Sequence, residues 1–248
     1  MAILVTRPHP DNDTTSAALR ARGFDVLPAP MLRFEAVPFQ DDADLQYGAV
    51  IVTSANALRA IADQPVKETL LKLPVFAVGE RTAATAREIG FAKVISADGD
   101  ATALRDLLLE RVKAKKLKKS ATLLYLAGAD LARDLAGELG ERGFNVVTHT
   151  SYRMTPVINL PAEVSDAFSA SGIQAVLHYS RRSARAFFEA AGAAGVEISA
   201  LAIPHCCLSD QVASVARDAG ATQVMVAKSP DENALFAALD RAIAPLSR

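Results

Sequence analysis

The chain of 248 residues has no tryptophan, 4 tyrosines and 10 phenylalanines, so it offers few flat side chains on which nucleic-acid bases stack. Its 27 basic and 28 acidic residues give a formal net charge of −1. A chain so balanced lacks the summed positive field that attracts nucleic acid or an anionic membrane. We therefore expect no nucleic-acid partner and no membrane partner, and any anion-binding site must be local.

Long apolar runs are also missing. No segment approaches the roughly 18 apolar residues that span a bilayer, and the short apolar run Ala2–Val5 is not an export signal. The two cysteines, Cys206 and Cys207, are adjacent, and neither has a spaced partner for zinc or for a disulfide. These absences predict a cytoplasmic protein.

Several cofactor motifs are absent as well. The sequence has no Walker A segment, no Gly-x-Gly-x-x-Gly after the first apolar run, no serine nucleophile elbow and no metal-spaced cluster of His, Asp or Glu. If the chain is an enzyme, we expect it to work without a metal and without an organic cofactor. Such a catalyst acts mainly by orienting its substrate and by fixed dipoles.

Short runs rich in branched aliphatic residues alternate with Ala-rich segments of helical length. This alternation predicts an α/β fold with parallel strands. The predicted strands are Ile3–Thr6, Asp25–Pro28, Ala49–Thr53, Val75–Val78, Lys93–Ser96, Thr122–Leu126, Asn145–Thr148, Ala175–Tyr179, Ile203–Leu208 and Thr222–Ala227. One of the predicted helices is Leu131–Arg142.

Three sequence segments recur in the same order, with offsets of 120, 126 and 130 residues. The pairs are Arg22–Val26 with Arg142–Val146, Ala49–Ser54 with Ala175–Ser180, and Ala86–Gly90 with Ala216–Gly220. Ordered self-similarity of this kind predicts two similar doubly wound lobes. Two extended segments, Leu32–Pro38 and Ser151–Pro156, each end in proline and are candidates for a pair of crossovers between the lobes.

The junctions that follow the predicted strands share a composition. Ligands of doubly wound sheets collect at the carboxyl ends of strands, where helix N-termini offer free backbone N–H groups and a positive dipole end to carboxylates or phosphates. The junctions are Thr6–Pro8, Thr53–Asn56, Gly79–Thr82, Ala127–Asp130, Ser180–Ser183 and Ser209–Gln211. At any one junction a helix cap explains the hydroxyl better than a ligand does, and only the repetition favours a polyanion site.

Taken together, these junctions resemble the uroporphyrinogen-III synthase family. The resemblance covers nearly the full length and rests on Val5–Pro8, Val52–Ala57, Val78–Ala83, Ser151–Arg153, His178–Ser180 and Ser229–Pro230. It implies a discontinuous first lobe of residues 1–34 and 157–248, a second lobe of residues 38–150, and crossovers at 35–37 and 151–156.

The resemblance also implies an activity in porphyrin and haem biosynthesis. Members of the family cyclise hydroxymethylbilane, a linear tetrapyrrole with eight carboxylates, to uroporphyrinogen III, with inversion of the terminal pyrrole ring, loss of water and no cofactor. We expect that polycarboxylate as the small-molecule partner, and a transient contact with the upstream enzyme that forms the bilane.

The family pattern assigns roles to residues at the junctions. Tyr152 is placed to hydrogen-bond the departing hydroxyl, although packing within the crossover is an equal alternative. Asp210 would repel an anion, so only the backbone is expected to bind beside it. The substrate-binding candidates are Arg7, Thr53, Ser54, Ala55, Asn56, Arg81, Thr82, Gly128, Ser180 and Ser209.

Two other classes of function are compatible with the sequence. One is a two-lobe small-molecule binding protein with a hinge and no chemistry, which an export signal or a DNA-binding segment would favour. The other is a glycosyl or nucleotide transferase with two Rossmann-like lobes, which usually needs a longer chain and a phosphate loop.

Overall fold

The computed structural model describes residues 1–40, 45–131 and 133–244. The chain forms two compact units. Unit 1 comprises Met1–Phe34 and Thr155–Arg248, and unit 2 comprises Glu35–Met154.

Unit 1 contains a five-stranded sheet with the order β11-β10-β9-β1-β2, in which the neighbours pair in parallel. Its strands are β1 (Ala2–Val5), β2 (Asp25–Pro28), β9 (Ile173–His178), β10 (His205–Cys207) and β11 (Val224–Val226). Its helices are α1 (Asp11–Ala21), α7 (Ala162–Ser169), α8 (Arg181–Ala193), α9 (Glu197–Leu201), α10 (Asp210–Asp218) and α11 (Glu232–Ile243).

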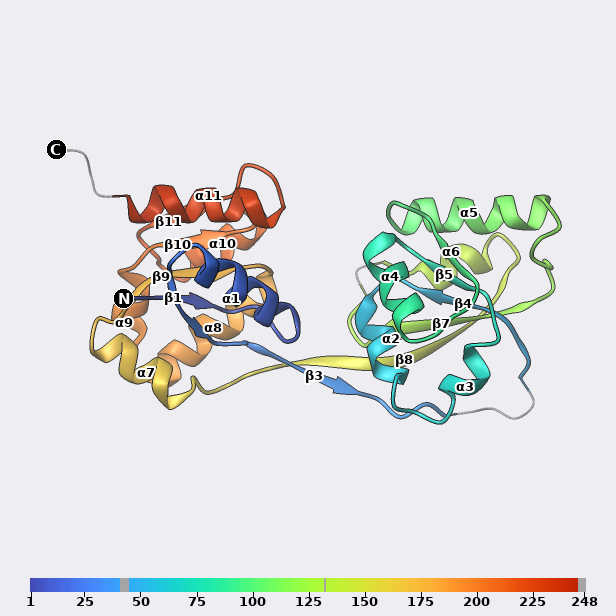
Figure 1. Ribbon diagram of the computed structural model, residues 1–248, viewed down its shortest axis with the longest axis horizontal. Coiled ribbons are helices and arrows are strands. Elements are labelled where there is room, and N and C mark those ends of the chain that lie inside the picture. The colour runs from blue at the N-terminus through green and yellow to red at the C-terminus, as the bar shows by residue number, and fades with distance from the viewer. Residues whose placement is uncertain (41–44, 132, 245–248) are drawn as a thin grey trace. The chain divides into compact units, whose positions relative to one another are not determined.

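Helices cover both faces of this sheet (Figure 1). Side chains alternate along a strand, so Ile3 and Val5 pack into the core formed with α1 and α11, while Leu4 packs into the core formed with α7, α8 and α9. All three side chains are fully buried. A strand buried on both faces is apolar without alternation, which is why Ala2–Val5 is recognisable in the sequence.

Unit 2 is built in the same way around the sheet β3-β8-β7-β4-β5-β6. Its strands are β4 (Tyr47–Val52), β5 (Val75–Ala77), β6 (Val94–Ser96), β7 (Thr122–Gly128) and β8 (Asn145–Pro156), with β3 (Leu32–Ala36) at the edge; the start of β3 and the end of β8 belong to unit 1. Its helices are α2 (Ala55–Ile61), α3 (Lys67–Leu70), α4 (Glu80–Glu88), α5 (Ala101–Lys113) and α6 (Leu135–Gly140). Val50 and Val52 pack on the α2 and α4 side, and Ala49 and Ile51 on the α5 and α6 side.

The two candidate crossover segments overlap β3, which ends at Ala36, and the last part of β8. These strands are neighbours in the sheet, and the Val37 amide donates to the carbonyl of Ser151 over 2.8 Å. β8 runs for 12 residues, from Asn145 to Pro156, whereas the sequence predicted a strand only as far as Thr148. It continues because its pairing with β7 runs on to Tyr152, and the buried Ser151 donates its hydroxyl to the carbonyl of Ala127 there.

The sequence repeat matches the strand order of the two sheets. The first repeat pair lies in β2 and β8. Each of these strands is the neighbour of the strand before it in the sequence, β1 and β7 respectively. The second repeat pair lies in β9 and β4. Counted from β2 in one sheet and from β8 in the other, each of these is the third strand. The prediction of an α/β fold with mainly parallel strands is confirmed. Among the described residues, no helix is both long and apolar enough to cross a membrane.

Two buried histidines are hydrogen-bonded to each other in unit 1. His178 Nε2 lies 3.0 Å from His205 Nδ1, and both rings are fully buried against Phe187 and Phe188. His205 Nε2 lies 2.9 Å from the carbonyl oxygen of Ala200, which only accepts, so this nitrogen carries the proton. The neutral His205 Nδ1 must then accept from His178 Nε2–H. Burial lowers the pKa of His205 to about 4 and that of His178 well below its usual value, so both rings are neutral.

Candidate functional site

A cavity of about 250 Å³ opens at the carboxyl ends of β4 and β7 in unit 2. It is lined by Thr53, Ser54, Ala101, Tyr125, Gly128, Asp130, Leu131, Arg133, Leu135 and Tyr152. Four of these residues, Thr53, Ser54, Gly128 and Tyr152, were predicted from the sequence as site residues. They meet because β4, β7 and β8 are parallel neighbours whose carboxyl ends share one edge of the sheet.

Tyr152 lies against Gly128. The two residues are partners across β7 and β8, and the Ala129 amide donates to the carbonyl of Tyr152 over 2.9 Å. A Cβ atom on Gly128 would lie 2.8 Å from both the Tyr152 hydroxyl oxygen and the carbon that bears it. The missing side chain of Gly128 therefore makes the space in which the phenol sits, and the phenol hydroxyl is held at the wall of the cavity.

A second phenol reaches this cavity from β7. The Tyr125 hydroxyl lies 3.0 Å from the Thr53 hydroxyl, and only 2% of the Tyr125 surface is exposed. Burial raises the pKa of Tyr125, against a smaller opposing effect of the hydrogen bond with Thr53, so the phenol stays protonated. Tyr125 was not predictable as a site residue from the sequence, because it lies inside a predicted strand, where an aromatic side chain is ordinarily part of the core.

Three further lining residues come from the loop before α6. The sequence predicted a helix from Leu131, but α6 begins at Leu135, because Asp134 caps it by accepting from the Gly137 amide over 2.9 Å. Asp130, Leu131 and Arg133 are thereby left in a loop at the cavity. Arg133 donates to the Glu138 carboxylate and to the Thr102 hydroxyl, so its charge is largely compensated.

Two helix N-termini lie at the same edge of the sheet. Ser54 caps α2, accepting from the Asn56 amide over 3.2 Å, and Ala55 is the first residue of that helix. The Asn56 side chain accepts from Arg59 over 2.8 Å. Since β4 and β5 are adjacent, the N-terminus of α4 lies beside that of α2.

In α4, the exposed Arg81 is the second residue and Thr82 the third. Thr82 is only 6% exposed, and among the described residues its hydroxyl has no hydrogen-bond partner. The helix is preceded by Gly79, which supplies no side-chain cap. The Thr82 hydroxyl is therefore available to a ligand at this helix N-terminus.

Arg7, a predicted binding residue in unit 1, is ion-paired. Its guanidinium lies 3.1 Å from Asp11 and 3.3 Å from Glu232, and stacks over the Tyr179 ring at 4.6 Å. Thr15 and Tyr179 also donate to the Glu232 carboxylate. The structure thus places Arg7 in a compensated network.

The other two predicted residues of unit 1 begin helices. Ser180 caps α8, its hydroxyl accepting from the Ser183 amide over 3.1 Å. Ser209 precedes α10 with extended backbone and makes no side-chain cap, and the first helical residue, Asp210, is exposed. Because Asp210 carries a negative charge at that point, any anion there has to be held by the backbone.

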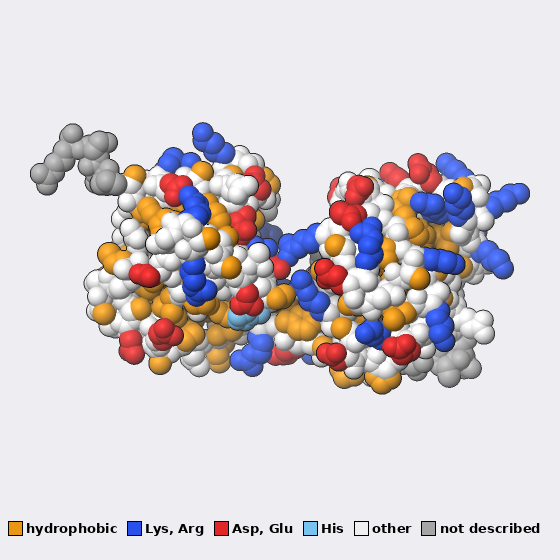
Figure 2. All heavy atoms as spheres, viewed as in Figure 1, with side chains coloured by type: hydrophobic (Ala, Val, Ile, Leu, Met, Phe, Trp, Pro, Cys, Tyr) orange, Lys and Arg blue, Asp and Glu red, His pale blue; other side chains and the backbone are white. Residues whose placement is uncertain are grey.

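Charged side chains of both signs are interspersed on the face seen in Figure 2, in keeping with the formal net charge of −1. Within residues 1–40, 45–131 and 133–244 there is no group of three or more His, Cys, Asp or Glu side chains able to hold a metal ion.

The chain matches the family model of uroporphyrinogen-III synthase HemD over residues 13–237. Among solved structures, it resembles uroporphyrinogen-III synthetase from Helicobacter pylori 26695 at 18% identity, with a TM-score of 0.62 over 95% of this chain and 96% of that chain. A mutant uroporphyrinogen III synthase from the extremely thermophilic bacterium Thermus thermophilus is also 18% identical, with a TM-score of 0.54 over 98% of each chain. At this identity the two structures show the fold alone. No curated protein sequence matches the chain.

Proposed function

Because the chain belongs to the uroporphyrinogen-III synthase family, we propose that the cavity beside Tyr152 is where it cyclises hydroxymethylbilane. The family match decides against the non-catalytic binding protein and the transferase. The protein is an enzyme of tetrapyrrole biosynthesis that forms uroporphyrinogen III with inversion of the terminal ring and loss of water. The observation that carries the site is the meeting of Thr53, Ser54, Gly128 and Tyr152 around one cavity.

The first chemical step needs a weak acid. When the carbon–oxygen bond of the hydroxymethyl group breaks, the pyrrole nitrogen stabilises the resulting azafulvene cation, and the departing hydroxyl gains negative charge. The Tyr152 hydroxyl donates a hydrogen bond to that oxygen in our proposal, and the close fit over Gly128 fixes its position. The neutral phenol of Tyr125 keeps the adjacent wall free of negative charge other than that of Asp130.

The second step requires the enzyme to hold the substrate in a folded conformation. Attack from the substituted carbon of the terminal ring gives a spiro intermediate, and its fragmentation and reclosure invert that ring. Unassisted closure gives the uninverted isomer, so the enzyme must hold the bilane folded. We assign this task to groups that bind carboxylates: the hydroxyls of Thr53, Ser54 and Thr82, the backbone amides and side chains at Ala55, Asn56 and Arg81, and the termini at Ser180 and Ser209.

Incubation with hydroxymethylbilane in buffer treated with a chelator tests the activity directly. After oxidation, separation of the isomers should show uroporphyrin III in excess over the type I isomer formed by heat-denatured protein. Predominance of type I with native protein would refute the activity, and loss of activity on metal removal would refute the cofactor-free mechanism.

Tyr152→Phe should lower kcat and leave the melting temperature nearly unchanged. Proton donation by a positioned side chain contributes about 10²- to 10⁴-fold, and a phenol with a pKa near 10 belongs at or below the bottom of that range. We therefore expect a loss of no more than about 10²-fold. Both quantities are measured on one preparation, and a wild-type kcat would return Tyr152 to a packing role.

Thr82→Ala should raise KM about tenfold without changing kcat. The hydroxyl of this buried side chain has no partner among the described residues, so its loss removes one hydrogen bond to a carboxylate, about 1.5 kcal/mol, and no bond within the fold. Thr82→Ser should restore KM. The matched control is Thr85→Ala on the same helix, whose hydroxyl is occupied by the carbonyl of Arg81; an equal rise in KM there would contradict a specific role for Thr82.

A further inference from the structure

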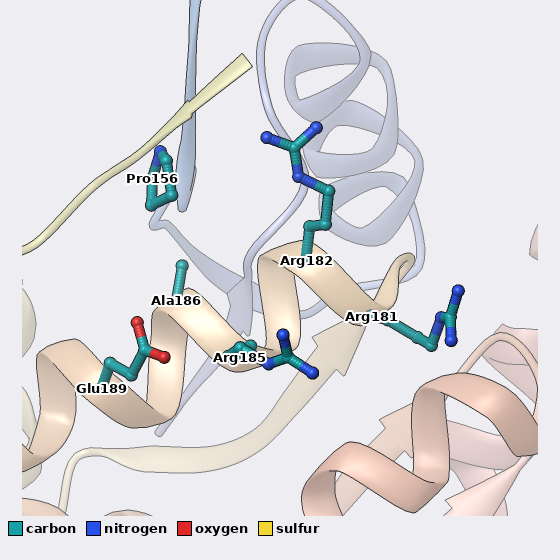
Figure 3. Close-up of a pocket in the computed structure, with 6 residues that line it drawn as sticks. All are labelled: Pro156, Arg181, Arg182, Arg185, Ala186 and Glu189. Atoms are coloured by element: carbon teal, nitrogen blue, oxygen red, sulfur yellow. The ribbon is translucent and has the colours of Figure 1, made fainter. Parts of the chain in front are cut away.

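A second cavity, of about 300 Å³, lies in unit 1 beside α8. Pro156, at the end of β8, forms one side, and the other lining residues belong to α8: Arg181, Arg182, Arg185, Ala186 and Glu189. Figure 3 shows the three arginine side chains extending from the N-terminal half of the helix, with Glu189 further along it.

The charge around this cavity is unbalanced. Three arginines and one glutamate line it, in a protein whose formal charge is −1. Elsewhere arginines lie beside acids, as in Arg22 with Asp240 at 2.7 Å. Among the described residues, by contrast, Arg181 and Arg185 have no ion pair, and neither has Glu189, although it lies four residues after Arg185.

We infer that this cavity binds the two carboxylate arms of one pyrrole ring of the substrate. Like charges gathered around one space repel each other, and a dianion relieves that repulsion. Guanidinium groups suit the task because each one pairs with a carboxylate through two parallel N–H donors. A volume of about 300 Å³ is at the lower end of small-molecule pockets, which fits a single ring with its arms and excludes the whole tetrapyrrole.

This inference rests on the proposed function and assigns a task that Arg7 does not perform. Arg7 already faces the carboxylates of Asp11 and Glu232, so it has little charge to offer a further anion. In our proposal, Arg181 and Arg185 of α8 supply the positive charge that selects a carboxylated ring over an uncharged one. They act on binding, since nothing places them at the bond that breaks.

The test is a charge series assayed with hydroxymethylbilane. In Arg181→Gln/Arg185→Gln, KM should rise about threefold to tenfold while kcat stays within about twofold, because exposed charges contribute modestly. Glu189→Gln should lower KM, an improvement that structural damage does not produce. The control is Arg20→Gln on α1, an exposed arginine outside the cavity lining, which should leave KM unchanged.

Salt gives an independent readout. The difference in KM between wild type and the double variant should shrink as ionic strength rises, since the lost interactions are screened charges. An unchanged KM in the double variant, or an equal change in Arg20→Gln, overturns the inference. A binding measurement separates this inference from the proposed function, because the affinity for uroporphyrin III can be followed by fluorescence without turnover. If the wild-type protein makes no type III isomer, the proposed function is refuted. If the wild type and the double variant bind uroporphyrin III with equal affinity, the α8 site is refuted.

Discussion

Acidification from pH 6.5 to about 4 should lower the free energy of unfolding of unit 1 by about 3 kcal/mol through His205 alone. Unfolded histidine titrates near pH 6.5, whereas burial lowers the pKa of His205 to about 4. Between these values the unfolded state binds more protons, so stability is complete above pH 6.5 and falls as the pH falls. His178, whose pKa burial and its partner ring also lower, adds loss in the same direction.

The hydrogen-bond pattern explains why protonation is so costly. A proton on His205 Nδ1 would face the Nε2–H of His178 at 3.0 Å, two donors in contact among aromatic rings. Denaturant unfolding at a series of pH values measures the effect. His205→Gln keeps a donor for the carbonyl of Ala200 and should flatten the pH dependence, whereas His9→Gln, at a side chain 58% exposed, should not. An identical slope in wild type and His205→Gln would contradict the prediction; if that variant does not fold, NMR titration of the wild-type ring decides.

Gly128→Ala should lower kcat/KM by about 10²-fold, at least as much as Tyr152→Phe lowers kcat. The added Cβ would lie 2.8 Å from the Tyr152 hydroxyl oxygen, closer than carbon and oxygen approach without a bond. The phenol must move, which misplaces its hydroxyl and brings the ring into a cavity of only about 250 Å³. Tyr152→Phe removes the hydroxyl but leaves the ring in place, so the cavity keeps its volume.

Steady-state kinetics with two comparisons test this prediction. Gly140→Ala, in the same unit, adds a Cβ with no heavy atom within 4 Å and should retain full activity. In a Tyr152→Ala background the clash is gone, so Gly128→Ala should cost little more there. If the fold losses in kcat/KM of the two substitutions multiply instead, Gly128 acts through something other than Tyr152.

Much of the fold was predictable because strands buried on both faces are uniformly apolar. All ten predicted strands are present, displaced by at most a few residues at their ends, apart from the long extension of β8. β3, Leu32–Ala36, was not predicted as a strand: the segment Leu32–Pro38 was interpreted only as an extended crossover that ends in proline, and Arg33 and Glu35 interrupt its apolar residues. An edge strand needs little apolar surface, so composition identifies it poorly.

The site was predictable only where its residues follow strands. Thr53, Ser54, Gly128 and Tyr152 come at strand ends, and parallel strands bring such ends together. Tyr125 lies inside a strand, and only its packing shows that the hydroxyl reaches Thr53. Arg133 was hidden inside a predicted helix, because Asp134 and not an earlier residue caps α6. The pairing of Arg7 with Glu232 joins residues 225 positions apart, a separation that no local pattern reveals.

The pairing of β1 with β9 dictates the order in which the protein is completed during synthesis. β1 is synthesised before the other described strands, yet Val5 meets Leu177, its partner in β9, only after the whole of unit 2 has been made. Unit 2 is contiguous from Glu35 to Met154 and has all its strands available by then. The first 34 residues must therefore wait, with the fully buried apolar side chains of β1 exposed, until the last third of the chain arrives. The N-terminal segment is thus among the last to reach its native place and is the part of the nascent chain most in need of protection from aggregation.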